Sequence, residues 1–409
     1  MGRVTSLDCP RCRARRPAEI GASTCPGCGL VLDILIDLDG ITPALAATIR
    51  ARPRGLWRWH ELLPVEDPAH IVSLGEGDTP LLATPRLAAL AGIERLYIKN
   101  DGLLPTGSLK DRVNTVAISR AREIGARLVA TPSTGNAAAS AAAYAAAAGL
   151  RCVVLVPETT APAKVAQARA HGARVVRVRG TFEVAAALFR EAVAAFGWYS
   201  TLSTNPWRNE GLKTYAYEVW EALGRAPDWM IHPEASGLGV AATWKGFGEL
   251  ERLGWVAGRP RMVAAQAAAA APLVTALAQG LEVPVPVEPG ETVAESIRVG
   301  RPNLGWQGLQ AIRASGGTAV AVTDEELLAA RALLAEHAGV FAEPSAAASL
   351  AAAIRLRRDG AIGPQDLVVC VVTGHGLKQP EPRSADEPPA PIAPDLGALR
   401  ALLAEASDA

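Results

Sequence analysis

The sequence predicts an α/β fold in which parallel β-sheets are covered by helices. Two observations lead to this prediction: short runs rich in β-branched residues alternate with longer helical stretches, and 49% of the residues are hydrophobic although only 5% are aromatic. Strands that alternate with helices at this spacing pair in parallel, because each helix returns the chain to the same end of the sheet. At 409 residues the chain exceeds a single core, so we expect two or three domains.

Eight strands and eight helices are expected in this pattern. The predicted strands are 95–99, 127–130, 152–156, 174–178, 229–232, 262–265, 318–322 and 367–372. The predicted helices are 113–124, 137–148, 163–171, 182–196, 210–223, 240–250, 324–337 and 345–357. Cys152 and Cys370 lie in continuous apolar strands and are interpreted as small core residues. Six prolines between Pro380 and Pro394 predict an extended tail, which ends in a short helix with leucines at 396, 399, 402 and 403.

The charge balance excludes some classes of protein. Forty-one Lys and Arg residues balance forty-one Asp and Glu residues, so general electrostatics would not hold this chain on nucleic acid or on an anionic membrane. No apolar segment of a secretory signal follows Met1, and the longest small-apolar run, 137–150, is too short to span a bilayer. We therefore expect a cytoplasmic protein without nucleic-acid or membrane partners.

Four of the six cysteines form two CxxC pairs, Cys9 with Cys12 and Cys25 with Cys28, twelve residues apart. Each pair turns two thiolates toward one point, and two facing pairs complete a tetrahedral Zn²⁺ shell. Redox cysteines are the alternative, although a single redox pair would not need a matched second one. Because four protein ligands leave no open position, the predicted zinc is structural. Zinc ribbons also occur in nucleic-acid binders, a reading that the neutral charge disfavours.

Polar loops follow several of the predicted strands. They are residues 105–112, 131–136, 234–239 and 372–378. Ligands of parallel sheets collect at the carboxyl edge of the strands, so these loops are the candidate site. Lys110 stands at a helix start, where the dipole disfavours its charged form and lowers its pKa, and a neutral amine can form a Schiff base. An exposed Lys–Asp pair is the simpler interpretation of Lys110, and ordinary helix capping that of Ser133, Thr134 and Asn136.

Seven segments in this order resemble the threonine synthase family. They are residues 74–81, 107–112, 133–136, 203–211, 297–302, 343–347 and 373–378, and the resemblance covers roughly residues 70–380. It implies an enzyme dependent on pyridoxal phosphate (PLP), with the tryptophan-synthase-β-like fold called fold type II and the active site between two parallel-sheet α/β domains. The implied organisation is a zinc ribbon at 1–40, a large PLP-binding domain from 41–104 and 201–378, a smaller inserted domain at 105–200 and a tail at 379–409.

The resemblance also implies roles for individual residues. Lys110 would bind PLP as a Schiff base and shuttle protons, Asn136 would hydrogen-bond the phenolic oxygen of PLP, and Thr373 would face its pyridine nitrogen. The cofactor phosphate would be cradled at a helix start by Ser236, Gly237 and Gly239. The substrate carboxylate would be bound by Ser133 and Thr134, and a substrate phosphate by Ser203, Asn205 and Arg208.

The implied reaction turns O-phospho-L-homoserine and water into L-threonine and phosphate, by γ-elimination and addition of water at Cβ. Several residues depart from the family pattern: Glu234 and Ala235 begin a cofactor-phosphate loop that is usually richer in glycine, Ala137 stands where threonine is frequent, and Leu109 and Leu104 replace the more usual Phe and Asn. A carboxylate at 234 would repel a phosphate unless it is turned away or protonated.

These departures leave the substrate open. The alternatives are another PLP-dependent elimination or replacement enzyme, similar to cysteate synthase or to threonine or serine dehydratase, and, more remotely, a catalytically silent protein that acts through its zinc ribbon. By analogy with related enzymes, a homodimer is a possible assembly.

Overall fold

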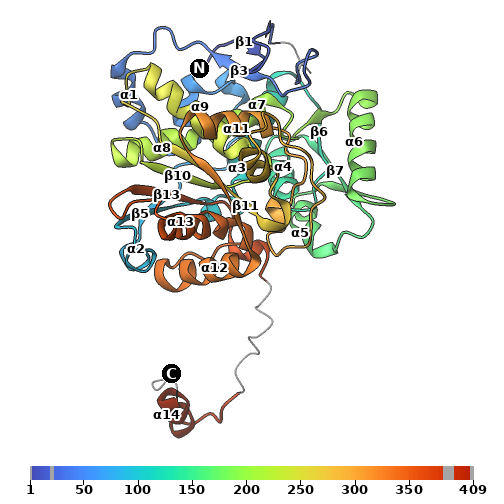
Figure 1. The fold of residues 1–409 in the computed structure, drawn as a ribbon. Helices are drawn as coiled ribbons and strands as arrows, with labels where there is room; N and C mark the ends of the chain where they lie inside the picture. Colours follow the sequence, from blue (N-terminus) through green and yellow to red (C-terminus); the bar gives the residue numbers. More distant parts are fainter. Residues whose placement is uncertain (1, 19–22, 381–390, 406–409) are drawn as a thin grey trace. The chain divides into compact units, whose positions relative to one another are not determined.

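The computed structural model describes residues 2–18, 23–380 and 391–405 and divides into two units, Met1–Lys378 and Gln379–Ala409 (Figure 1). The second unit contains the predicted tail helix, α14 (Leu396–Glu405). The side chains at 402 and 403 lie outside the described residues, so its apolar face stays a prediction. All further description concerns the first unit.

A six-stranded sheet forms the centre of the first unit. Its strand order is β12-β11-β10-β13-β5-β4, with β4 (Leu81–Ala83) antiparallel at the edge and the other five strands parallel. The parallel strands are β5 (Arg95–Asn100), β10 (Trp229–Pro233), β11 (Arg261–Ala267), β12 (Thr318–Val322) and β13 (Leu367–Val372).

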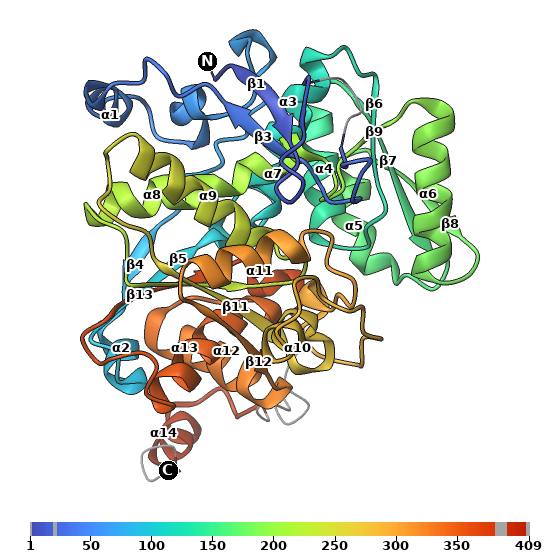
Figure 2. The same cartoon turned by 45° about the horizontal axis from the view of Figure 1, so that its top comes forward.

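Both faces of this sheet are covered by helices (Figure 2). One face packs on α8 (Thr214–Leu223), α9 (Leu238–Arg252) and α11 (Gly305–Ala314), the other on α2 (Pro85–Ala91), α12 (Asp324–Ala338) and α13 (Ala348–Arg358). Successive side chains of a strand point to opposite faces, and accordingly Met230 joins one core while Ile231 joins the other. The continuous apolar runs of the sequence reflect this double burial.

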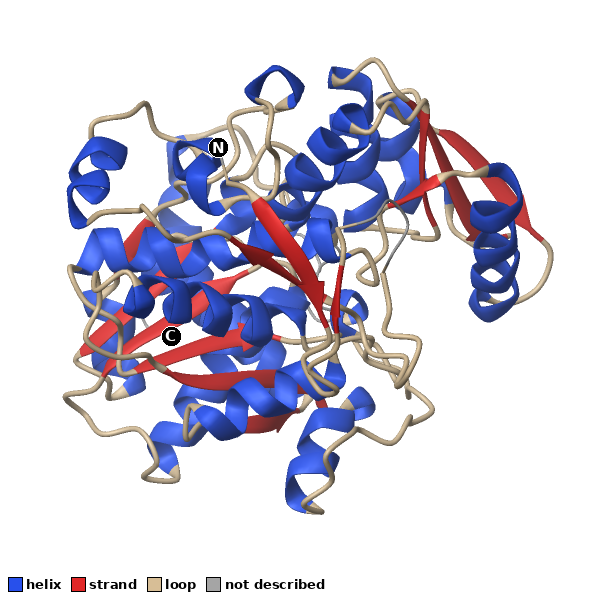
Figure 3. Ribbon diagram, turned by 90° about the horizontal axis from the view of Figure 1, so that it is seen from above, coloured by secondary structure: helices blue, strands red, loops and turns tan. Residues whose placement is uncertain are grey.

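A second, four-stranded parallel sheet lies beside the first, as Figure 3 shows from above. Its order is β8-β7-β6-β9, from β6 (Leu128–Thr131), β7 (Arg151–Pro157), β8 (Arg174–Val178) and β9 (Tyr199–Ser200). Helices α3 (Lys110–Glu123), α4 (Asn136–Ala147) and α5 (Pro162–Ala170) cover one face, and α6 (Phe182–Phe196) covers the other.

The N-terminal segment is a small antiparallel sheet that shares the core of the first unit. Its strands are β1 (Val4–Asp8), β2 (Arg15–Arg16) and β3 (Asp33–Ile36) in the order β2-β1-β3. Leu7 and Ile34 belong to the same buried cluster as Phe247 of α9. Two further hydrogen bonds attach the segment, from Lys245 Nζ to the carbonyl of Ile34 (2.5 Å) and from Gln307 Nε2 to that of Val31 (2.8 Å).

The predicted α/β fold is confirmed, and all eight predicted strands are present. The expected helix 210–223 is a 3₁₀ turn at Glu210–Lys213 followed by α8, and a short helix that was not expected, α7 (Pro206–Asn209), precedes it. Helix α9 begins two residues earlier than expected, at Leu238. The sequence analysis missed the short elements β1–β4, β9, α1 (Pro43–Arg50), α2, α10 (Pro272–Ala278) and α11. The division into a large domain and an inserted domain at 105–200 stays a prediction. Over the described ranges, no helix combines the length and apolar character that crossing a membrane requires.

Candidate active site

A pocket lies where four parallel strands end. Its walls come from the loops that follow β5, β6, β10 and β13, which is the edge that the sequence indicated. Five of the predicted residues line it together, namely Lys110, Asn136, Ser236, Gly239 and Thr373. Its walls also include four polar side chains for which the sequence analysis had predicted no role: Tyr215, His232, Ser296 and Glu343.

Lys110 is the first residue of α3, and the turn before it is fixed to the last loop of the sheet. The Leu109 N–H donates to the carbonyl of Thr373 (2.8 Å), and the His375 N–H donates to the carbonyl of Gly107 (2.9 Å). Gly107 has φ +83°, a conformation in which glycine is favoured. The lysine and Thr373 are therefore held side by side by backbone hydrogen bonds.

The surroundings of the Lys110 amine lower its pKa from 10.5 to about 8. Burial is the main cause and the charge of Arg208 adds to it, while Glu343 and Glu234 act in the opposite direction. The sequence analysis expected this direction but attributed it to the helix dipole, whereas burial dominates. A substantial fraction of the amine is consequently neutral near pH 7–8.

A buried ion network supports the start of α3 from below. The Arg112 guanidinium is fully buried and donates to both carboxylate oxygens of Asp101 (2.7 and 2.9 Å). It also donates to both carboxylate oxygens of Glu218 (2.5 and 2.8 Å). Its central carbon lies 4.4 Å from the ring centroid of Tyr215. Tyr215 itself donates to Asp101 (2.5 Å) and lines the pocket. This network joins α3 to β5 and α8, so it fixes the helix that carries Lys110.

Glu343 is a pocket residue whose role the sequence analysis did not assign, although its segment was part of the resemblance. Nδ2 of Asn136 donates to its two carboxylate oxygens at 3.1 and 3.0 Å, and Ser296 Oγ donates to it at 3.4 Å. The carboxyl group is 3% exposed, and burial raises its pKa. A buried acid directly before Pro344, in a segment that resembles the family, was the signal that could have indicated it.

His232 lies at the pocket floor in its neutral form. Burial lowers its pKa to about 3, its ring packs edge-on against Tyr215 (centroids 5.2 Å apart), and its Nε2 lies 3.1 Å from Thr243 Oγ1. No feature of the sequence marked Tyr215 or His232 as a pocket residue, because both lie inside regular elements with ordinary core spacing.

The start of α9, which was predicted to bind the cofactor phosphate, has backbone N–H groups that donate to a side chain of the preceding loop, Glu234. Glu234 accepts hydrogen bonds from the backbone N–H groups of Ser236 (3.1 Å) and Gly237 (2.8 Å) on one oxygen and of Val240 (3.0 Å) on the other. The residue is 2% exposed, and burial raises its pKa. Lys110, Asn136 and Thr373 offer this pocket an amine, an amide and a hydroxyl, which are groups that suit a pyridine aldehyde. The N–H groups of Ser236, Gly237 and Val240 do not suit a phosphate while they donate to Glu234.

The predicted substrate residues do not belong to the described lining of this pocket. Ser133 Oγ accepts from the Gly135 N–H (3.3 Å), and Ser203 Oγ accepts from Asn303 (2.8 Å). Asn205 caps α7, because its Oδ1 accepts from the N–H groups of residues 207 and 208 and its Nδ2 donates to the carbonyl of residue 200. No hydrogen bond of the Thr134 side chain is observed among the described residues.

Arg208 is a buried cation that its described neighbours hardly satisfy. It is 4% exposed, its Nε has no partner among the described residues, and its Nη1 makes one long contact to Asn209 (3.4 Å). Burial lowers its pKa to about 10, and its charge reaches Lys110. A buried guanidinium with so few hydrogen-bond acceptors around it suits an anionic ligand.

The four N-terminal cysteines come together. The Sγ atoms of Cys9, Cys12, Cys25 and Cys28 all lie within 4.8 Å of one another, which can hold a metal ion. The pKa of Cys25 is lowered to about 7, mainly by a hydrogen bond from the backbone N–H of Gly27 to its sulfur. A lower pKa favours the thiolate form of this cysteine. Cys152 and Cys370 are buried in strands, as expected.

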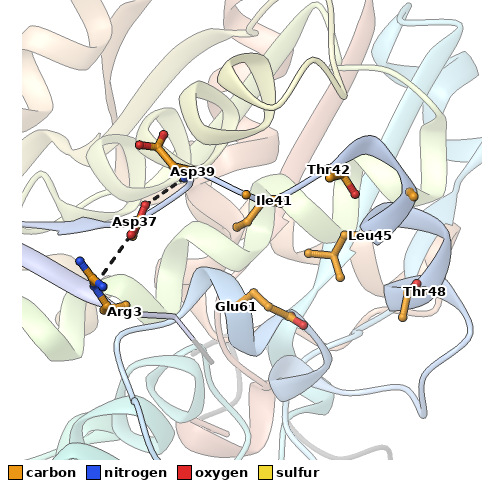
Figure 4. A pocket seen from close by; sticks show the side chains of 10 residues that line it. Arg3, Asp37, Asp39, Ile41, Thr42, Leu45, Thr48 and Glu61 are labelled. Atoms are coloured by element: carbon orange, nitrogen blue, oxygen red, sulfur yellow. Dashed lines mark hydrogen bonds and ion pairs between the residues drawn. The ribbon is translucent and has the colours of Figure 1, made fainter.

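A second hollow, shown in Figure 4, has no lysine in its described lining that could form a Schiff base. Its charged lining comprises Asp37, Asp39, Glu61 and Arg3, and Arg3 forms a 3.8 Å ion pair with Asp37. Its acids do not converge on one point; among the described residues, only the four cysteines form a cluster that could hold a metal. The pocket around Lys110 is therefore the candidate active site.

Comparison with known proteins agrees with this geometry. Lys110 is a partly buried lysine at a helix start, between two parallel sheets. The family model "Pyridoxal-phosphate dependent enzyme" matches residues 72–374, which places the chain in the class of PLP-dependent enzymes of fold type II. The chain is 41% identical over 401 residues to the threonine synthase of Methanocaldococcus jannaschii, covering 97% of this chain and 99% of that one. It is 42% identical over 353 residues to the threonine synthase of Mycobacterium tuberculosis, covering 85% and 96%. The chain belongs to the threonine synthase family.

Solved structures show the same fold at lower identity. Maize serine racemase superimposes with a TM-score of 0.66 at 20% identity, covering 81% of this chain and 93% of that one. A threonine deaminase from Solanum lycopersicum gives a TM-score of 0.65 at 21% identity, covering 79% and 92%. The predicted family and fold type are confirmed.

Proposed function

We propose that this chain converts O-phospho-L-homoserine and water to L-threonine and phosphate in the pocket around Lys110. The observation that carries the proposal is the buried Lys110 amine with a pKa of about 8, in one pocket with Asn136 and Thr373. Membership of the threonine synthase family supports the choice of substrate.

Three residues would hold the cofactor ring. Lys110 would bind the aldehyde carbon, Asn136 would donate to the phenolic oxygen, and the Thr373 hydroxyl would face the ring nitrogen. A hydroxyl in this position, unlike a carboxylate, does not force the nitrogen to be protonated. When bound, PLP supplies the electron sink that stabilises negative charge on the substrate carbon.

The protein's own contribution is proton transfer and orientation. An amine with a pKa of about 8 accepts and returns protons near neutral pH, which is what a general base and acid requires of Lys110. The N-terminus of α4, with Ser133 and Thr134, would bind the substrate carboxylate. Arg208 would offer parallel N–H groups to the substrate phosphate, with Ser203 and Asn205 beside it.

Product analysis tests this proposal directly. Full-length protein supplied with PLP and O-phosphohomoserine should release phosphate and form threonine in equal amounts. Lys110→Ala and the charge-conserving Lys110→Arg should each lower the rate by about 10²–10⁴-fold, because neither variant retains a transferable amine of this pKa. Turnover of a different amino acid in place of phosphohomoserine would favour the cysteate synthase-like or dehydratase-like alternatives. Absence of any Lys110-dependent ligand binding would favour the silent alternative.

We also propose that Cys9, Cys12, Cys25 and Cys28 hold one structural Zn²⁺. Four sulfur ligands complete a tetrahedral shell and leave no open position. Metal analysis should give about one zinc per chain, which Cys28→Ser removes while the buried control Cys152→Ala retains it. Removal by a chelator should lower the unfolding temperature, because the ribbon shares a core with α9. Full zinc content in Cys28→Ser would contradict this assignment. The cytoplasmic location and the homodimer remain predictions from the sequence.

A further inference from the structure

The start of α9 is a cradle of backbone N–H groups that this chain fills with its own carboxylate. The first N–H groups of a helix have no partner within the helix and attract anions. Here both oxygens of Glu234 are used: one accepts from Ser236 and Gly237, the other from Val240, at 2.8–3.1 Å. Three donors at this helix start are therefore satisfied by a group with the same charge sign as a phosphate, and two of them, the N–H groups of Ser236 and Gly237, were expected to bind that phosphate.

The cradle is fixed by its surroundings. Gly237 has φ +86°, and a Cβ added there would lie 2.3 Å from the carbonyl oxygen of Leu304. The Leu304 N–H donates to the carbonyl of Ser236 (2.8 Å), and the Glu234 N–H donates to that of Ala265 (2.8 Å). Because the backbone is held from both sides, the cradle cannot turn its N–H groups toward a second anion while the Glu234 carboxylate stays in place.

The space that glycine leaves in the cradle is occupied as well. A Cβ added at Gly239 would lie 2.9 Å from the nearer carboxylate oxygen of Glu234 and 3.2 Å from His232 Nδ1. The family resemblance implied that Gly239, with Ser236 and Gly237, would cradle the cofactor phosphate in this loop. In the structure, the Glu234 carboxylate lies in that space.

Two acids already lie near the Lys110 amine. Glu343 and Glu234 oppose the lowering of its pKa while Arg208 adds to it, and Lys378 is a further cation that acts on Glu343. The nearby His232 is neutral, because burial lowers its pKa to about 3. A phosphate dianion at the cradle would add negative charge beside a buried carboxylate, which is unfavourable in a medium of low dielectric constant.

We propose that Glu234 is an internal occupant of the cradle, so that the phosphate group adds little to cofactor affinity and the pocket also accepts pyridoxal, the unphosphorylated aldehyde. A carboxylate offers about four lone-pair sites, and three are taken by N–H groups. The remaining site suits an O–H donor, which the hydroxymethyl group of pyridoxal supplies and a phosphate dianion does not. The inference rests on the proposed function, because it assumes that the aldehyde end is bound at Lys110.

Calorimetric titration of the full-length apo protein with PLP and with pyridoxal tests the proposal. The quantity of interest is the ratio of the two dissociation constants, which measures the contribution of the phosphate group. Because both aldehydes are titrated into every variant, any difference between PLP and pyridoxal in free solution is the same for each protein and cancels when the ratios are compared. The variants are Glu234→Thr, which empties the cradle, Glu234→Gln, which removes the charge and keeps the shape, and Glu343→Gln, which neutralises the other pocket acid as a matched control.

We expect Glu234→Thr to increase the contribution of the phosphate by at least about tenfold over wild type, because charge-assisted hydrogen bonds to three N–H groups become available. The ratio of dissociation constants in Glu234→Gln should lie between those of wild type and Glu234→Thr. Glu343→Gln should leave this ratio within about twofold of wild type, since the described hydrogen bonds of Glu343 join it to Asn136 and Ser296 and not to the cradle. Inorganic phosphate should raise the unfolding temperature of Glu234→Thr more than that of wild type.

The outcomes separate this inference from the proposed function. Intact PLP binding with the same ratio in wild type, Glu234→Thr and Glu234→Gln would overturn the role of Glu234 and leave the proposed function standing. Failure of all variants to bind either aldehyde would overturn both. If Glu234→Thr does not fold, the near-isosteric Glu234→Gln carries the test, and an unchanged ratio there would refute the charge effect.

Discussion

Asn136 and Glu343 join the two parallel sheets across the active-site pocket. Asn136 begins the helix that follows β6 of the four-stranded sheet, Glu343 precedes the helix that returns to β13 of the central sheet, and Nδ2 of Asn136 lies 3.0 and 3.1 Å from the two carboxylate oxygens. Because the Glu343 carboxylate also raises the pKa of Lys110, this one residue couples the contact between the sheets to the protonation of the catalytic amine.

Glu343→Gln should therefore lower the pKa of Lys110 below its value of about 8. The amide conserves the contact to Asn136 but removes a negative charge that favours the ammonium form. The pH dependence of Lys110 modification by an amine-specific reagent, followed by mass spectrometry, measures this pKa. The control is Glu295→Gln, which breaks an exposed ion pair with Lys164 and should leave the midpoint in place. A midpoint that rises in Glu343→Gln would show that another group sets the charge of the amine.

Lys110 should reduce the stability of the apo protein at neutral pH. Its folded-state pKa of about 8 is below the unfolded value of 10.5, so the unfolded state binds more protons between these pH values and stability rises with pH across this window. Below pH 8 the unfavourable contribution is constant at about 3 kcal/mol, because a difference of about 2.5 between the folded and unfolded pKa values corresponds to roughly 3.4 kcal/mol.

Replacing Lys110 by Met should consequently raise the free energy of unfolding of the apo protein at pH 7 by about this amount and remove the increase between pH 8 and 10.5. Urea unfolding at several pH values provides the measurement. The same pH dependence in both proteins would place its origin at a different group.

Arg112 should be far more important for stability than an exposed arginine. Arg112→Met leaves the buried carboxylates of Asp101 and Glu218 without their main partner, and we expect a loss of about 3–5 kcal/mol. Arg225→Ala, which breaks a largely exposed pair with Asp228, should change stability by less than about 1 kcal/mol. Denaturant unfolding of the two variants compares them directly, and equal losses would mean that the network contributes no more than a surface pair.

The fold and part of the site could be predicted because they depend on patterns local in sequence. The continuous apolar run 367–372 is buried on both faces, and Lys110, Asn136 and Thr373 each follow a strand or begin a helix at the carboxyl edge of one of the two parallel sheets. Residues such as Tyr215 and His232 could not be found, because only tertiary packing turns one side of a regular element toward the pocket. Glu234 was noticed as an unexpected acid, but its hydrogen bonds depend on the backbone course of residues 236–240, which a sequence does not specify.

Arg208 should determine affinity for the phosphorylated substrate. Its guanidinium is 4% exposed with an unpaired Nε among the described residues, and burial lowers its pKa to about 10, so a bound phosphate would supply the missing charge and acceptors. Arg208→Ala should raise KM for O-phosphohomoserine by at least about tenfold, since a charge-assisted hydrogen bond contributes about 1.5–3 kcal/mol, while the dissociation constant of PLP changes little. Steady-state kinetics and cofactor titration on the same preparation measure the two quantities. Arg225→Ala is the control, because it removes an exposed arginine that does not line the pocket. Equal weakening of substrate and cofactor in Arg208→Ala would show that the arginine supports the pocket as a whole instead of binding the substrate phosphate.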